Sequence, residues 1–184
     1  GESNVIQDPD RLQACAVDGL APQAIVCPGS AAEISSLLHY ANAEKLAIVP
    51  RGSGTKMAAG EVPPRFDLVL STARLNRIVD YDIANLSLTV EAGLTLAAVQ
   101  KRLAGEKKGN FLPLDPPYSE KATLGGIIAA NASGPKRFIY GSARDLLLGL
   151  KAVTPTGDIV SFGGKTVKNV SGYDMTKLMI GSWG

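Results

Sequence analysis

The chain has 184 residues, 45% of them hydrophobic, and its 19 basic and 17 acidic residues give a formal net charge of +2. This composition predicts a soluble globular protein with one core or two small adjoining cores. The charges are spread without a dense basic stripe, which argues against nucleic-acid binding, and no apolar run approaches the ~20 residues of a membrane-spanning helix.

The cysteines and the single histidine limit the metal chemistry that the chain can support alone. Cys15 and Cys27 form no C-x-x-C motif, so we expect no zinc site, iron–sulfur cluster or disulfide scaffold. His39 is interpreted as a residue on a helix face rather than as a catalytic group. We expect a cytoplasmic protein without membrane insertion, and any peripheral association with the inner membrane would run through partner proteins.

The first part of the chain predicts alternating helices and strands. A short helix at 10–17 precedes a strand at 23–28, and an amphipathic helix at 29–45 with Ser30 as its N-cap precedes a strand at 46–50. The order strand, helix, strand indicates parallel strands, with the next loop at the C-terminal end of a strand.

The rest of the chain predicts more strands and shorter helices. The expected elements are strands at 66–71, 77–82 and 86–93, a helix at 95–109 with Thr95 as cap and Gly105 near its end, an irregular stretch at 111–121, a short helix within 122–134 and a β-hairpin at 146–164. The pattern changes near residue 84, which predicts two subdomains, 1–83 and 84–184.

The stretch "PRGSGTKM", residues 50–57, resembles a phosphate-binding loop but fits neither of the two best-known patterns. Thr55 precedes Lys56, so a P-loop's magnesium-binding hydroxyl is misplaced, and Met57 occupies the third glycine position of a Rossmann fingerprint. Gly52 and Gly54 allow close backbone approach, so the N–H groups of this loop could form a nest for an anion. The alternative is a tight turn that needs glycine for its shape alone.

A second glycine-rich stretch, "ATLGGIIAANASGPKRFIYG", predicts a helix that begins at Gly125 and Gly126. Unsatisfied N–H groups at a helix N-terminus suit a phosphate. Two such turns in one chain would fit a diphosphate, which points to a dinucleotide ligand. The alternative is that these glycines only allow close helix packing.

Four stretches in unbroken order resemble the FAD-binding domain of the vanillyl-alcohol oxidase and p-cresol methylhydroxylase (PCMH) type. They are "PRGSGTK", "LPLDPPYSEKATLGGIIAANASGPKRFIYGSARD", "LGLKAVTPTGDIVSFGGKTVKNVSGYD" and "LMIGSWG". Within that family the chain looks most like an FAD-binding component of bacterial glycolate oxidase, and D-lactate dehydrogenases are next. The resemblance implies an α+β fold of two α/β subdomains with the cofactor in the cleft between them.

The resemblance also implies which residues bind FAD, while catalytic residues stay unknown and no metal is expected. Residues 51–56 would cradle the pyrophosphate through main-chain donors, 168–174 and Ile180 would close over the cofactor, and Asp174 with Lys168 could instead be a structural ion pair. The residues implied to bind FAD are Arg51, Gly52, Ser53, Gly54, Thr55, Lys56, Asp115, Pro116, Pro117, Thr123, Leu124, Gly125, Gly126, Asn131, Ser133, Gly134, Tyr140, Gly141, Asp174 and Ile180.

By the same resemblance, the chain is the FAD-binding portion of a flavin-dependent 2-hydroxy acid (glycolate-type) oxidase or dehydrogenase. FAD would be non-covalent, because Thr55 and Lys56 stand where some relatives attach flavin through a histidine. Expected partners are the small 2-hydroxy acid and the catalytic and iron–sulfur subunits of a glycolate oxidase-like complex. The alternatives are a non-catalytic FAD-binding subunit, a D-lactate dehydrogenase-like enzyme and a flavin-free structural module. Family members continue past Gly184, so we expect a fragment that is inactive without the missing part or partner subunits.

Overall fold

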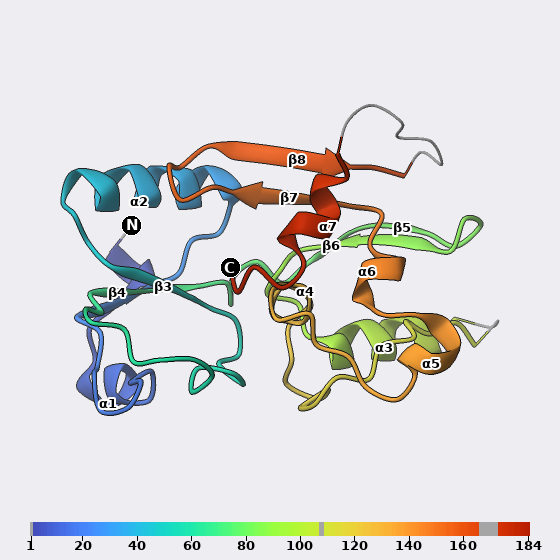
Figure 1. Ribbon diagram of the computed structural model, residues 1–184, viewed down its shortest axis with the longest axis horizontal. Helices are drawn as coiled ribbons and strands as arrows, with labels where there is room; N and C mark the ends of the chain where they lie inside the picture. The colour runs from blue at the N-terminus through green and yellow to red at the C-terminus, as the bar shows by residue number, and fades with distance from the viewer. Residues whose placement is uncertain (1, 107–108, 166–172) are drawn as a thin grey trace. The chain divides into compact units, whose positions relative to one another are not determined.

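The computed structural model describes residues 2–106, 109–165 and 173–184 (Figure 1). These residues divide into two compact units. The first unit comprises Gly1–Leu75 and Ala152–Val160, and the second comprises Asn76–Lys151 and Ser161–Gly184. Among the helices of the described residues, none has the length and apolar character that crossing a membrane requires.

A four-stranded, mostly parallel sheet forms the framework of the first unit. Its strands follow the order β1-β2-β4-β3, in which β2 and β3 both run parallel to β4 and β1 runs antiparallel to β2. The elements are η1 (Glu2–Asn4), β1 (Val5–Ile6), α1 (Pro9–Gln13), β2 (Ala24–Val26), α2 (Ala31–Ala43), β3 (Ile48–Arg51) and β4 (Leu68–Ser71). The predicted strand–helix–strand arrangement is therefore confirmed, with β4 inserted between its two strands.

Local signals explain where α2 begins and how the sheet is buried. The Ser30 hydroxyl accepts a hydrogen bond from the Glu33 N–H at 3.1 Å, which is the N-cap expected from the sequence. The core beside the sheet contains Cys15, Ile25 and Val69, and Val69 is fully buried. In strand β3, Val49 packs against this core and Pro50 is exposed to solvent. The last residue of the strand, Arg51, leads directly into the glycine loop.

The second unit combines short helices with antiparallel strands. Its elements are β5 (Ile78–Asp82), β6 (Ser87–Val90), α3 (Leu96–Ala104), α4 (Leu124–Ala129), α5 (Arg137–Tyr140), α6 (Ala143–Leu146) and α7 (Met175–Met179). Helix α3 begins at the predicted cap, Thr95, and ends at Gly105. Its buried residue Val99 packs in one core with Ile127 of α4 and Ala143 of α6.

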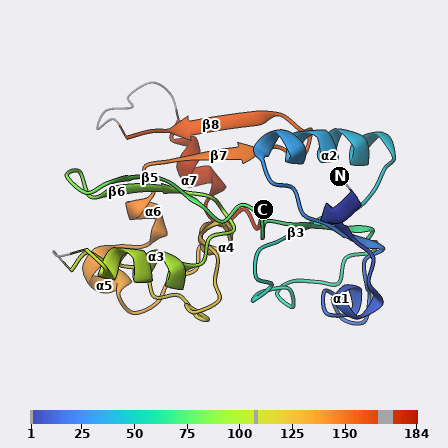
Figure 2. The ribbon, with the colours of Figure 1, turned by 180° about the vertical axis from the view of Figure 1, so that it is seen from behind.

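The hairpin of β7 (Gly149–Val153) and β8 (Ile159–Gly163) belongs partly to each unit. Its turn lies against α2 in the first unit, where the Ser35 hydroxyl donates to the Gly157 carbonyl at 2.5 Å and the Asn42 side chain donates to the Pro155 carbonyl at 2.8 Å. Figure 2 shows the end of α2 beside this hairpin from behind. The contacts explain why residues 152–160 return to the first unit.

The boundary between the two units does not lie between residues 83 and 84, where the sequence predicts it. Those residues lie in the turn between β5 and β6, which pair with each other from Ile78 opposite Val90 to Asp82 opposite Ser87. A boundary there would separate two hydrogen-bonded strands of one hairpin. The structure instead divides the chain after Leu75. That the two units are the subdomains of an FAD site stays a prediction.

Candidate functional site

The loop after β3 leaves a run of backbone donors without partners. The sheet ends with Arg51 opposite Ser71, and the Thr72 N–H donates to the Arg51 carbonyl at 3.0 Å. Within the described part of the chain, none of the five N–H groups from Gly52 to Lys56 donates to a protein acceptor. All five residues except Ser53 are partly buried. These donors are free of protein acceptors, so the loop is open to an acceptor from a ligand.

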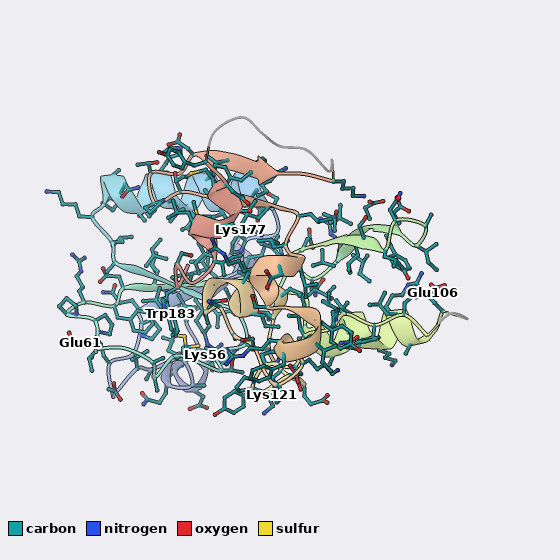
Figure 3. The ribbon with its side chains drawn as sticks, turned by 45° about the vertical axis from the view of Figure 1, so that its right-hand side comes forward. Lys56, Glu61, Glu106, Lys121, Lys177 and Trp183 are labelled. Atoms are coloured by element: carbon teal, nitrogen blue, oxygen red, sulfur yellow. The ribbon has the colours of Figure 1, made fainter. Side chains whose placement is uncertain are left out.

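The conformation of the loop fits this role. Gly54 has a φ of 79°, in the left-handed region, and Met57 closes the turn by donating its N–H to the Gly54 carbonyl at 3.5 Å. The Met57 side chain packs against the core of the first unit. The methionine at the third glycine position of a Rossmann pattern therefore anchors the end of the loop. Figure 3 marks Lys56, the residue just before it.

Arg51 adds a positive charge at the start of the loop. Its Nε atom is buried and has no hydrogen-bond partner within the described residues. An unpaired, buried donor on a charged side chain is rare in folded proteins. Both the backbone and this side chain are thus compatible with a bound anion.

The sequence predicts a second anion-binding turn at the N-terminus of α4, with unsatisfied N–H groups. The prediction that these N–H groups are unsatisfied is wrong. The helix begins at Leu124 with Thr123 as N-cap, not at Gly125. Its first N–H groups are already bonded: Leu124 to the Leu94 carbonyl at 2.8 Å, Gly125 to the Ala92 carbonyl at 2.8 Å and Gly126 to the Thr123 hydroxyl at 3.3 Å. Protein acceptors satisfy these donors, so they are not the unsatisfied N–H groups that the prediction assumed.

Gly125 has a packing role instead. A Cβ atom at this position would lie 2.7 Å from the Ala92 Cβ and 2.8 Å from the Ala92 carbonyl oxygen. These distances are shorter than any real contact of a Cβ atom. The alternative interpretation of Gly125, close helix packing, is the one that this geometry supports.

Asp115 organises the turn that follows α4 (Leu124–Ala129). Its two carboxylate oxygens accept a hydrogen bond from the Lys136 N–H at 3.2 and 3.1 Å. A Cβ atom on Gly134 would overlap the Asp115 carbonyl oxygen and would lie 2.6 Å from Oδ1. Pro116 is buried next to Asp115, whereas Pro117 is exposed. The Asp115 carboxylate therefore shapes the segment 133–136.

The remaining residues of this stretch that the sequence predicts to bind FAD lie near one another in the sequence, between Asn131 and Gly141. Asn131 has a positive φ of 46° and Gly141 one of 82°. The N–H groups of Ser133 and Gly134 make no hydrogen bond to the protein among the described residues. Tyr140 is 45% exposed, and its ring meets the Phe111 ring edge-on with centroids 5.5 Å apart. The segment from Asn131 to Gly141 thus presents backbone donors and two exposed aromatic side chains, Phe138 and Tyr140.

Asp174 acts as the N-cap of α7 (Met175–Met179). Its carboxylate accepts from the Thr176 N–H at 3.1 Å and from the Thr176 hydroxyl. These bonds, the hydroxyl first, hold the pKa of Asp174 below its ordinary value. Ile180 follows as the half-buried C-cap. Of the predicted closing segment 168–174, residues 168–172, including Lys168, lie outside the described residues.

The chain after α7 is tied to α4, which could not be foreseen from the sequence. The Gly181 N–H donates to the Ile128 carbonyl at 3.1 Å, and the Trp183 N–H donates to the Ala129 carbonyl at 2.9 Å. The Trp183 side chain is 56% exposed, so it does not cap the core. Backbone bonds between distant segments have no local signature that would have revealed them.

An open groove of about 430 Å³ in the second unit is a separate feature. Its apolar lining includes Leu96, Phe111 and Leu114. The Gln100 side chain at this groove already donates to the Leu112 carbonyl at 2.6 Å and accepts from the Leu112 N–H at 3.1 Å. Of the residues predicted to bind FAD, only Asp115 lines this groove.

Comparison with known proteins identifies the family. The profile of the family described as "FAD binding domain" matches residues 22–163. Similar curated relatives are the glycolate oxidase subunit GlcD of Bacillus subtilis, 41% identical over 89% of this chain, and a D-2-hydroxyglutarate dehydrogenase of Xanthomonas citri pv. viticola, 40% identical over 89%. The glycolate oxidase subunit GlcE of Escherichia coli is 38% identical over 80% of the chain.

The solved structure of an alkyldihydroxyacetonephosphate synthase is similar with a TM-score of 0.82 and 25% identity, covering 99% of this chain and 38% of that chain. The chain spans only 34% of the length of GlcD and of the D-2-hydroxyglutarate dehydrogenase, and 41% of GlcE. The α+β fold and the likeness to glycolate oxidase subunits expected from the sequence are confirmed. With the glycine loop after β3 and the matched residues 22–163, this chain belongs to the FAD binding domain family.

Proposed function

We propose that this chain is the FAD-binding portion of a flavin-dependent 2-hydroxy acid oxidoreductase, and that residues 51–56 hold the diphosphate of FAD. The observation that supports this proposal most directly is the run of N–H groups from Gly52 to Lys56 without protein acceptors. Ser53, Thr55 and Lys56 can add side-chain donors to the same loop. The contrast with α4, whose first-turn donors are all satisfied, favours the β3 loop as the diphosphate site.

The residues of the second unit have supporting roles in this proposal. Asn131, Ser133, Gly134, Tyr140 and Gly141 lie along the flavin, where backbone donors and an aromatic ring suit a polar, planar group. Asp115 and the prolines beside it, together with residues 123–126, shape the nucleotide end, and Asp174 and Ile180 flank the cofactor. The position of FAD between two subdomains stays a prediction.

The reaction proposed is oxidation of the hydroxyl-bearing carbon of a 2-hydroxy acid. Bound FAD supplies the two-electron acceptor that amino-acid side chains lack. This chain's residues bind and orient the cofactor and exclude water from it. The relatives named for glycolate and for D-2-hydroxyglutarate support a 2-hydroxy acid and do not distinguish among such acids.

The partner proteins are part of the same proposal. Two of the relatives are named as subunits, which supports a role within a complex of several different chains. The chain's described residues contain no group of three His, Cys, Asp or Glu side chains that could hold a metal ion. We propose that electrons pass to a separate iron–sulfur protein of that complex. Binding of FAD is proposed to be non-covalent, since Thr55 and Lys56 stand where some relatives attach flavin through a histidine.

Binding of FAD by the purified chain tests the proposal. We expect a flavin absorption spectrum after purification or, for the flavin-free protein, a rise in melting temperature when FAD is added. A hundredfold excess over the dissociation constant stabilises the folded state by about 2.7 kcal/mol if FAD binds only that state. Adenosine, which lacks the diphosphate, serves as the control and should cause no comparable shift. Absence of both flavin bands and an FAD-dependent shift would contradict the proposal.

A further inference from the structure

The hairpin of β7 and β8 has little stability of its own. It forms a separate two-stranded sheet, and in these two strands, which the structure describes completely, every residue is exposed or only half-buried. A two-stranded hairpin in water is marginally stable unless it packs against other elements. The hairpin therefore depends on what holds its two ends, the tip at 154–158 and the base at Gly149 and Gly163.

Three side chains of α2 hold the tip. Ser35, His39 and Asn42 are spaced by four and three residues, so they lie on one side of the helix. Ser35 and Asn42 donate to the carbonyls of Gly157 and Pro155 at 2.5 and 2.8 Å. A Cβ atom on Gly157 would lie 2.7, 2.8 and 2.9 Å from three ring atoms of His39. The single histidine of the chain therefore packs directly against the backbone of the tip.

The tip is also closed by its own hydrogen bonds. The Thr154 N–H donates to the Asp158 carbonyl and the Gly157 N–H donates to the Thr154 carbonyl, both at 2.9 Å. The Thr154 hydroxyl accepts from the Asp158 N–H at 3.1 Å. Because the turn is closed in this way, holding the carbonyls of Pro155 and Gly157 holds the whole tip.

The base of the hairpin packs against α7. A Cβ atom on Gly163 would overlap the Leu148 carbonyl oxygen and would lie 2.8 Å from the Thr176 methyl carbon. The Gly164 N–H donates to the same Leu148 carbonyl at 3.0 Å. Thr176 is 2% exposed, and both its N–H and its hydroxyl donate to the Asp174 carboxylate. Helix α7 lies beside this end of the hairpin in Figures 1 and 2.

We propose that Ser35, His39 and Asn42 are positioning residues for the end of α7 that flanks the cofactor. Held at its tip, the hairpin keeps its base against Thr176, and Thr176 keeps the Asp174 carboxylate in place. The link from the tip to α7 depends on these contacts alone. Its effect on FAD rests on the proposed function, in which Asp174 flanks the cofactor. The three α2 side chains act only through the hairpin and do not touch FAD.

The first test detects the link without a cofactor. In the ¹⁵N-labelled, flavin-free chain, Ser35→Ala combined with Asn42→Ala removes both hydrogen bonds that α2 donates to the tip. We expect amide hydrogen exchange to accelerate at Gly157 in the tip and also at Gly164 and Thr176. The expected acceleration is about five- to thirtyfold, which corresponds to the loss of one or two hydrogen bonds.

Three further variants define the origin of the effect. His39→Ala removes the ring that packs on Gly157 and should accelerate exchange at the same three amides. Ser36→Ala changes an exposed neighbour on α2 that has no side-chain hydrogen bond among the described residues, and it should leave all three rates unchanged. Gln23→Ala removes a hydrogen bond to Asp67 elsewhere in the first unit and should not affect the base of the hairpin or α7.

The second test uses FAD. Coupling between two sites is reciprocal, so binding of FAD to the wild-type chain should slow amide exchange at Gly157 in the tip. The double variant of Ser35 and Asn42 is expected to raise the dissociation constant for FAD by about fivefold or more. Ser36→Ala should leave this constant unchanged. A purely local role of the α2 side chains would alter neither the protection by FAD nor its affinity.

The outcomes separate the inference from the proposed function. Acceleration that stops at Gly157, or that is equally large in Gln23→Ala, would overturn the link between the tip and α7. If wild-type chain binds FAD while the tip stays unprotected and the double variant binds normally, the positioning role is wrong and the proposed function stands. If wild-type chain binds no FAD, the proposed function fails, and the exchange rates of the flavin-free chain still decide the link. Acceleration at Thr176 together with weaker binding of FAD supports both.

Discussion

The carbonyl oxygen of Asp115 occupies the space in which a Cβ atom on Gly134 would have to lie. The same residue's carboxylate accepts from the Lys136 N–H, so Asp115 contacts the turn at 133–136 through both its backbone and its side chain. Glycine at 134 is thus required by close approach of two backbone segments rather than by its torsion angles. This contact gives Gly134 a role that does not depend on any ligand.

We predict that Gly134→Ala destabilises the flavin-free protein. The added methyl group would press on backbone atoms of Asp115, which cannot move aside as a flexible side chain could, and overpacking of this kind costs about 1–3 kcal/mol. The free energy of unfolding, measured with urea, checks this. Gly105→Ala is the matched control, because a Cβ atom there meets its nearest atom, the Arg102 carbonyl oxygen, at 3.4 Å. Equal stabilities of the two variants would contradict the packing argument.

We predict that Asp115→Ala loosens the turn at Lys136 more than Asp115→Asn does. Alanine removes both acceptors of the Lys136 N–H, whereas asparagine keeps one carbonyl oxygen in reach. A lost hydrogen bond of this kind costs about 1 kcal/mol. Hydrogen exchange of the Lys136 amide should accelerate about fivefold in Asp115→Ala, which corresponds to that free energy. Unchanged exchange at Lys136 would show that this hydrogen bond does not protect the turn.

The parts of the fold set by neighbouring residues could be predicted from the sequence. Ser30 and Thr95 were expected as N-caps, and each accepts the hydrogen bond of a cap, because a short polar side chain before an apolar helix satisfies donors only a few residues away. The position of the glycine loop could also be predicted, because the loop begins where the apolar strand β3 ends.

The chemistry of α4 could not be predicted in this way. The N–H groups of Leu124 and Gly125 are bonded to the carbonyls of Leu94 and Ala92, which lie about 30 residues earlier in the chain. A glycine-rich helix start has the same local sequence whether its donors are free or bonded. The return of residues 152–160 to the first unit likewise depends on contacts with Ser35 and Asn42, more than a hundred residues away.

We predict that Gly125→Ala destabilises the flavin-free protein and that Ala92→Gly partly relieves this effect. Removing the Ala92 methyl group eliminates the 2.7 Å overlap but leaves the carbonyl oxygen at 2.8 Å. A double-mutant cycle of unfolding free energies should therefore show favourable coupling between the two positions. If Gly125→Ala left stability intact and weakened only FAD binding, Gly125 would act on the ligand and not through packing.

We predict that the contacts of Asp67 stabilise the first unit at neutral pH and that this stabilisation is lost at acidic pH. Asp67 is buried, and its carboxylate accepts from the Ala47 N–H at 2.6 Å, from the Arg65 guanidinium at 2.7 Å and from the Gln23 side chain at 3.2 Å. The Ala47 N–H first, and then Arg65, hold the pKa of Asp67 below its ordinary value in the folded protein. The folded state therefore binds a proton at this carboxyl less readily than the unfolded state does.

The sign of the effect follows from linkage. Because the folded pKa is depressed, the stabilisation is fully present above the unfolded pKa of about 3.9 and is lost as the pH falls through the folded pKa. Asp67→Asn should lower the free energy of unfolding at neutral pH, and its difference from wild type should shrink in acid. Asp10→Asn, which changes an exposed carboxyl without a side-chain hydrogen bond among the described residues, is the control. Parallel pH profiles of wild type and Asp67→Asn would show that the Asp67 contacts do not discriminate between the charged and the protonated carboxyl.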